Sequence, residues 1–274
     1  MAQDPVEWEA DLSLLYLERL RKHLAETGFE LRVFSHPRLR SNRPHHLLQE
    51  IIREQRVACW VLFSVPKPVH EWFHARSLPA VVFGTCYPGV PLPAIDIDNR
   101  AVCRHAVGVF LKHGHRHLAM LTRGPGAVGG DLASEEGFLE GIRKSGLPDA
   151  RGIVVHHDST KADICRKLDA LLGLSQPPSG LLICMPGHAV AVLTYLLSKG
   201  MRIPQDMSLI CRDADPHLEY ASPAMACYPF AYQTHGDRLC RRVVELATTG
   251  VLPLKYRLMM PHFENGETIG PPRG

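Results

Sequence analysis

The chain has 274 residues, of which 45% are hydrophobic and 22% charged, and its formal net charge is +3 at pH 7. This length favours about two domains, and the small, evenly spread positive charge gives no sign that these residues bind nucleic acid themselves. The sequence has no run of 18 apolar residues, and residues 1–9 are too acidic for a secretory signal, so we expect a cytoplasmic protein without a membrane span.

The first half of the sequence predicts alternating helices and strands. An amphipathic helix is expected over residues 6–27, closed by Gly28. Further helices are predicted over residues 44–55 and 69–76, and strands over residues 29–34, 58–63 and 80–83. Residues 1–5 are too few and too polar to form a first strand before the first helix. Either a longer parent supplies that strand, or the first sheet is built differently.

The second half continues the same alternation. Asp98 or Asn99 can cap a helix that runs to about Lys112. Strands are predicted over residues 118–122, 153–156, 181–184, 207–211 and 256–260, and helices over residues 132–144, 162–172, 189–199 and 237–248. Strand and helix alternating at this spacing predict an α/β protein with two parallel sheets, each covered by helices on both faces.

Cofactor, metal and catalytic motifs give weak signals. Gly124, Gly126 and Gly129 match a dinucleotide-binding spacing, but a proline lies inside the turn and no acidic residue ends the next strand, so a flexible loop is favoured. His113, His115 and His117 lack an obvious fourth metal ligand. The eight cysteines include no Cys-x-x-Cys pair and fit reduced core thiols. We expect no cofactor, no metal and no enzyme activity, since no catalytic motif is present.

Three stretches carry a family resemblance. The first spans residues 97–119 and contains Ile-Asp-Asn-Arg-Ala and Gly-His-Arg-His-Leu-Ala. The second contains Gly137-Phe138, Gly141-Ile142 and Gly146-Leu147. The third is Gly-Met-Arg-Ile-Pro-Gln-Asp-Met-Ser-Leu-Ile at residues 200–210. Together with Ser222-Pro223 and Gly236, these motifs make residues 10–265 resemble the lactose/galactose repressor (LacI/GalR) family of transcription regulators.

The resemblance implies two Rossmann-like subdomains with parallel sheets, similar to type I periplasmic binding proteins. Residues 1–97 with 229–252 would form the first subdomain, and residues 98–228 with 253–274 the second. The implied function is effector binding and homodimerisation for a DNA-binding regulator, with a small molecule, by family a sugar, held between the subdomains. DNA would be contacted only through a headpiece that is absent from this chain. The alternatives are a solute-binding protein of a transporter and, with less support, a sugar or nucleotide enzyme.

The resemblance also implies where an effector would bind. Family members that bind sugars or purines have an arginine three residues before the Gly-Phe pair, an Asn-Asp pair after the strand at residues 181–184, and an aspartate after the strand at residues 209–211. Here Ser134, Met185-Pro186 and Asp213 occupy those places, so only the aspartate is kept. A serine has a single hydroxyl group and cannot replace the several N–H donors of an arginine guanidinium. New contacts could come from residues that follow strands or begin a helix, namely Arg123, His157, Asp158, His188 and Arg212, although each also fits a solvated loop residue.

Overall fold

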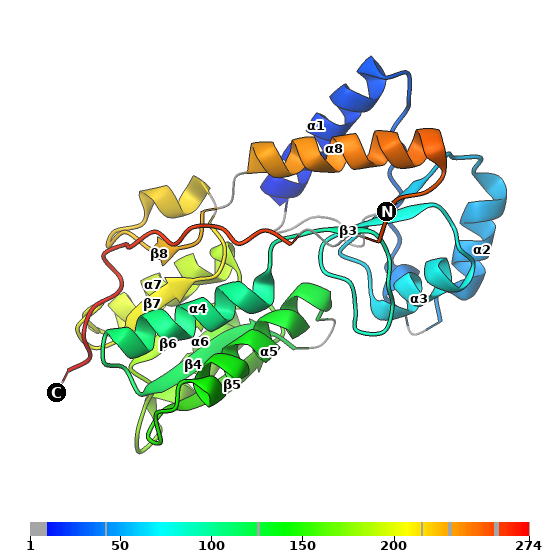
Figure 1. Ribbon diagram of the computed structural model, residues 1–274. Coiled ribbons are helices and arrows are strands. Elements are labelled where there is room, and N and C mark those ends of the chain that lie inside the picture. Colours follow the sequence, from blue (N-terminus) through cyan, green and yellow to red (C-terminus); the bar gives the residue numbers. More distant parts are fainter. Residues whose placement is uncertain are drawn as a thin grey trace. The chain divides into compact units, whose positions relative to one another are not determined.

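The computed structural model describes residues 10–41, 43–124, 127–214, 216–229, 232–254 and 258–273 (Figure 1). The chain forms two compact units. Unit 1 consists of Met1–Ile97, Val128–Gly130 and Ala231–Met259, and unit 2 of Asp98–Ala127, Asp131–Phe230 and Met260–Gly274. Each unit contains one sheet whose strands are all parallel, so the predicted α/β class is confirmed.

Unit 1 is built on a short sheet with the strand order β1-β2-β3. The strands are β1 (Trp60–Phe63), β2 (Ala80–Phe83) and β3 (Ala94–Ile95), and the helices are α1 (Ala10–Glu26), α2 (His45–Glu54), α3 (Lys67–Ala75) and α8 (Tyr232–Thr249). A 3₁₀ turn, Pro37–Arg40, precedes α2. Figure 1 shows α1 and α8 side by side, and both of these helices belong to unit 1.

The side chains of β1 and β2 alternate between two layers, as the period of a strand requires. Trp60 and Leu62 pack with Phe73 of α3 in a buried cluster on one face. On the other face, Phe63 stacks on Phe83 with ring centroids 5.3 Å apart. Tyr16 of α1 packs edge to face on Phe83, with ring centroids 4.7 Å apart. Helices therefore cover both faces, which explains why these strands are nearly continuous apolar runs in the sequence.

The predicted strand over residues 29–34 is wrong. These residues are extended in backbone but form no ladder with another strand among the described residues. Their alternation of apolar and polar side chains indicated a strand, yet a strand also needs a hydrogen-bonding neighbour. The predicted strand over residues 256–260 lies partly outside the described residues, and Met259 makes a single parallel bridge with Ile97.

Unit 2 contains a five-stranded sheet with the order β5-β4-β6-β7-β8. The strands are β4 (His117–Arg123), β5 (Arg151–His157), β6 (Gly180–Ile183), β7 (Ser208–Cys211) and β8 (Ala226–Cys227). The helices are α4 (Asn99–Lys112), α5 (Gly129–Lys144), α6 (Lys161–Leu172) and α7 (Pro186–Ser198), and a 3₁₀ turn covers Pro216–Tyr220. Asp98 caps α4 by accepting a hydrogen bond from the Ala101 amide at 2.8 Å, as predicted.

Two glycines of the second motif allow α5 to approach α4 closely. A Cβ on Gly137 would lie 2.1 Å from the carbonyl oxygen of Arg100, and a Cβ on Gly141 would lie 2.8 Å from the Cβ of Val107. Neither position has room for a side chain. The Gly-Phe pair is therefore a packing feature, in which Gly137 admits the neighbouring helix and Phe138 is fully buried.

A carboxylate on α5 gives this helix pair a defined response to acid. Only 3% of the Glu140 side chain is exposed, and Lys144 Nζ and Arg100 Nε lie 2.5 and 2.7 Å from its oxygens. The hydrogen bonds from Lys144 and then Arg100 lower the pKa of Glu140 from 4.5 to about 2. A carboxyl group whose pKa falls on folding stabilises the protein above its unfolded pKa and loses that contribution as the pH falls through its folded pKa.

We therefore expect Glu140→Gln to flatten the fall in melting temperature between pH 4.5 and about 2. Thermal unfolding followed by circular dichroism over this pH range measures the effect. Glu136, whose side chain is 57% exposed, pairs with the same Arg100, so Glu136→Gln is the matched control and should leave the slope unchanged. Equal slopes for both variants would contradict the expectation.

None of the eight cysteines, all within the described residues, forms a disulfide. Among those same residues, no helix combines the length and apolar character that crossing a membrane requires.

Candidate functional site

The candidate site lies at the carboxyl edge of the sheet in unit 2. Parallel strands end at the same edge, where open α/β sheets bind ligands. Arg123 is the last residue of β4 and His157 the last residue of β5, while Arg212 and Asp213 follow β7 directly. His188 lies in the first turn of α7, after β6. The strand order thus brings five of the seven sequence-predicted residues to this edge.

Arg212 is the central group of the site. Its side chain is 9% exposed, and its guanidinium makes a bidentate pair with Asp213, at 3.0 Å from Nε to Oδ1 and 2.5 Å from the second nitrogen to Oδ2. A further nitrogen donates to the Ser134 hydroxyl at 2.9 Å. Burial alone would lower the pKa of Arg212, but the Asp213 carboxylate raises it above its usual range. The side chain therefore stays charged.

Ser134 is fully buried on α5, at the position where the resemblance implies an arginine. It contributes a hydroxyl that accepts a hydrogen bond from Arg212. The resemblance implies an arginine at position 134 of α5. Here the guanidinium beside this position belongs instead to Arg212, which follows β7. Because the same guanidinium engages both oxygens of Asp213, the one retained aspartate is already paired within unit 2.

A second ion pair extends this charge network. Arg123 donates from Nε to Asp131 Oδ2 at 3.1 Å, and the other Asp131 oxygen lies 3.9 Å from Arg212. The Asp131 side chain is 2% exposed. Sequence reasoning missed Asp131, although an acidic residue in the first turn of a helix, a few residues after a strand-ending arginine, was an available signal. Two arginines and two aspartates balance in charge.

Two imidazoles lie beside this network. The rings of His157 and His188 meet edge to face with centroids 4.5 Å apart. His157 is 2% exposed, and its Nδ1 accepts a hydrogen bond from the Ser159 amide at 3.0 Å. Among the described residues, His157 Nε2 and His188 Nδ1 are buried with no hydrogen-bond partner. Buried polar atoms of this kind are uncommon and call for an explanation.

Burial keeps both imidazoles neutral at ordinary pH. It lowers the pKa of His188 to about 4, with a smaller contribution from the neighbouring His157, and it also lowers the pKa of His157. Since the Ser159 amide donates to Nδ1 of His157, the proton of the neutral ring is on Nε2. His157 therefore presents a hydrogen-bond donor, and the pair can bind a polar molecule without a change of charge.

Asp158 has a local structural role. Its Oδ1 accepts hydrogen bonds from the amide and the hydroxyl of Thr160, at 2.9 and 2.7 Å. These bonds hold the turn that leads into α6, where the Thr160 side chain caps the helix. The Thr160 hydrogen bonds lower the pKa of Asp158, which is stabilised as a carboxylate in the turn. The position of Asp158 next to His157 in the sequence did not predict this structural role.

The glycine and histidine motifs near α4 are structural where they are described. Gly114 has a φ of +96° and lies just after the end of α4 at Lys112. Both ring nitrogens of His115 are used, with Nδ1 2.8 Å from the Ser179 hydroxyl and Nε2 2.8 Å from the Gly270 carbonyl. The described residues contain no cluster of three side chains that could bind a metal ion. Two residues of the glycine-rich loop, 125 and 126, lie outside the described residues.

Two α/β units, each built on a parallel sheet, are the architecture expected of a periplasmic-binding-protein-like fold. Residues 107–269 match the family model for the periplasmic binding protein-like domain, which is more than half of the sequence, and the chain belongs to this family.

Curated relatives are HTH-type transcriptional regulators by name. The HTH-type transcriptional repressor CytR of Escherichia coli (strain K12) is 24% identical over 151 residues, covering 55% of this chain and 44% of the repressor. The HTH-type transcriptional regulator CelR of Thermobifida fusca is 24% identical over 230 residues, covering 82% of this chain and 66% of the regulator. The chain therefore spans about half to two thirds of the length of these relatives.

Solved structures with the same fold include a regulatory protein of the LacI family from Chloroflexus aggregans, with a TM-score of 0.82 at 20% identity, covering 98% of this chain and 96% of the other. A LacI family transcriptional regulator from Bifidobacterium animalis subsp. lactis gives a TM-score of 0.79 at 18% identity, with 96% of both chains covered. The predicted fold and the resemblance to LacI/GalR-type regulators are confirmed.

Proposed function

We propose that this chain is the effector-binding module of a DNA-binding transcription regulator and that the carboxyl edge of the unit 2 sheet contacts the effector. The names of the relatives support a role in transcription regulation. The observation that carries the site is the pair of imidazoles of His157 and His188, each with a buried polar atom that has no partner among the described residues. Such atoms cost free energy unless a bound molecule or water satisfies them.

The chemistry of the edge favours a neutral molecule rich in hydroxyl groups. Arg123 and Arg212 are paired with Asp131 and Asp213, so the charges balance before any ligand arrives. An anionic or cationic effector would have to break one of these pairs, which is costly for buried charges. A sugar or a nucleoside can instead exchange hydrogen bonds with the imidazoles and the outer oxygens of the network.

Binding fits this arrangement better than catalysis. Asp213 is held by two hydrogen bonds from Arg212 and is not poised as a base, and the Ser134 hydroxyl accepts a hydrogen bond from Arg212. A nucleophile would need an adjacent base within hydrogen-bond reach. As further parts of the proposal, the regulator acts as a homodimer and contacts DNA through a separate headpiece.

A thermal-shift screen of this chain against pentoses, hexoses, uronic acids, sugar phosphates and purine nucleosides tests the site. A ligand at 100 times its dissociation constant adds about 2.7 kcal/mol, and each kcal/mol raises the melting temperature by about 2–4 °C in a protein of this size. We expect a neutral sugar or nucleoside to give such a shift, and His157→Leu to abolish it.

His156 provides the matched control. It precedes His157 on β5, its side chain is 49% exposed, and it pairs with Glu135 instead of the charge network. His156→Leu should leave the ligand-induced shift unchanged. A shift that survives His157→Leu would place the effector elsewhere, and the absence of a shift with every compound would overturn the proposed site.

A further inference from the structure

A segment rich in arginine and histidine leads into helix α2 of unit 1. Residues 36–46, which we call the basic turn, contain three arginines, three histidines and no acidic residue. The backbone forms the 3₁₀ turn Pro37–Arg40 and then enters α2 at His45. The first turn of α2 also contains no acidic residue. The positive charge of the basic turn is therefore not neutralised by its own segment of the chain.

Buried side chains and one hydroxyl group hold the basic turn in a defined shape. Leu39 and Leu48 are fully buried in the apolar core of unit 1. The Ser41 hydroxyl donates a hydrogen bond to the Arg38 carbonyl at 2.8 Å and accepts one from the Arg43 amide at 3.3 Å. A single oxygen atom thus connects the backbones of the two arginines. Their side chains therefore leave the turn from neighbouring points.

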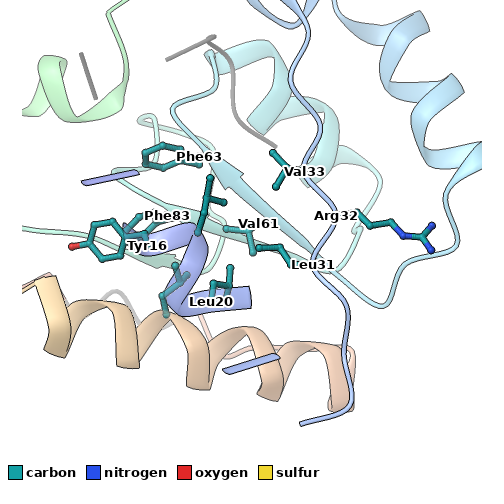
Figure 2. A pocket seen from close by; sticks show the side chains of 10 residues that line it. Tyr16, Leu20, Leu31, Arg32, Val33, Val61, Phe63 and Phe83 are labelled. Carbon is teal, nitrogen blue, oxygen red and sulfur yellow. The ribbon is translucent and has the colours of Figure 1, made fainter. Parts of the chain in front are cut away.

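The charges of Arg38 and Arg43 are not balanced by carboxylates. Both side chains are exposed, and neither guanidinium forms an ion pair in the part of the chain that the structure describes. The arginine that precedes the basic turn differs from them. Arg32 pairs with Glu30 at 3.2 Å, and Figure 2 shows its guanidinium turned away from the apolar side chains around it. Two like charges held near each other repel, and an anion bound between them would remove this repulsion.

We propose that the basic turn binds the phosphate group of a small phosphorylated molecule. A phosphate monoester carries about two negative charges near neutral pH, which matches the guanidinium groups of Arg38 and Arg43. Guanidinium groups bind phosphate through paired, charge-assisted hydrogen bonds. His45 and His46, both exposed at the start of α2, can supply further N–H donors. A site of a few residues suits one phosphate group better than the row of phosphates along a nucleic acid.

Inorganic phosphate is the first probe, added to the full chain in a phosphate-free buffer and followed by two-dimensional NMR of the backbone amides. We expect saturable shifts of the Ser41 and Arg43 amide signals. The Ser159 amide, at the proposed effector site in unit 2, should not shift. Sodium chloride should weaken the binding, because salt screens the attraction between exposed charges. Ribose 5-phosphate should compete with inorganic phosphate at the same amides.

Variants of the protein decide whether the basic turn is responsible. Arg38→Gln and Arg43→Gln should each weaken phosphate binding by about tenfold or more, the usual effect of losing a hydrogen bond to a charged group. Arg53→Gln is the matched control, since it removes the same charge from an exposed, unpaired arginine in the last turn of α2. Arg53 lies about 12 Å along the helix from His45, and its loss should change binding by less than about twofold.

The remaining outcomes separate this proposal from the proposed effector site. His157→Leu should leave phosphate binding unchanged, so either proposal can fail without the other. Phosphate binding that survives both Arg38→Gln and Arg43→Gln, or no binding of phosphate and ribose 5-phosphate at all, overturns the proposal. Binding of a short DNA duplex that these substitutions abolish and that phosphate does not displace would assign the basic turn to nucleic acid, which also overturns it.

Discussion

Replacing Arg212 by methionine is expected to lower the free energy of unfolding by about 3–5 kcal/mol, the usual cost of removing one partner of a buried ion pair. Arg212 is 7% exposed and interacts with Asp213 and Ser134, with Asp131 3.9 Å away. Its removal leaves the carboxylate of Asp213 and the hydroxyl of Ser134 without their donor. Urea unfolding followed by far-ultraviolet circular dichroism measures the change.

A double substitution separates the ion pair from the space it fills. Asp213→Leu alone should also destabilise the protein by about 3–5 kcal/mol, because it leaves the guanidinium buried without its main partner. Arg212→Met combined with Asp213→Leu should be much less destabilising than the sum of the two, since both charges are removed together. Strict additivity of the two single effects would contradict the pairing described here.

Replacing Gly137 by alanine is expected to lower the free energy of unfolding by about 1–3 kcal/mol, the range for overpacking a close contact. The added Cβ would lie 2.1 Å from the Arg100 carbonyl oxygen, which belongs to the backbone of α4 and cannot rotate away. One helix must shift relative to the other. Urea unfolding of the variant and the parent chain, under identical conditions, gives the difference.

Gly108 is the matched control for this substitution. It also lies within a helix, α4, but a Cβ at this position would meet no atom within 4 Å. Gly108→Ala should therefore raise the free energy of unfolding by about 0.5–1 kcal/mol, because alanine loses less backbone entropy in a helix. If both variants behaved alike, helix propensity and not the contact with Arg100 would govern position 137.

Much of the fold could be predicted because periodicity reports burial directly. The apolar run at Ala80–Phe83 is the strand β2 with the same bounds as predicted, and α6 begins at Lys161, one residue before its prediction. The strand over residues 29–34 failed for a different reason. Alternation fixes which side chains face the protein, but a ladder depends on a neighbouring strand, which no local pattern records.

The site was predictable only in part. Chain order placed Arg123, His157 and Arg212 after strands, and the rule that parallel strands share one edge brings them together. The link from Arg212 to Ser134 joins residues that are 78 positions apart and depends on the path of a long side chain. The sequence did not reveal that Thr160 holds the Asp158 carboxylate in a turn, and the contact of Asp158 with an effector stays a prediction.

The hydrogen bond that the Ser159 amide donates to His157 affects the chemistry of the proposed site. By donating to Nδ1 of His157, it fixes the tautomer of a ring whose pKa is already lowered by burial. The opposite nitrogen then carries a proton permanently and meets an incoming molecule only as a donor. A hydroxyl or ether oxygen satisfies it, whereas a protonated amine would place one donor against another. At the proposed site, this donor would favour a hydroxyl group over an ammonium group at the same place on an effector.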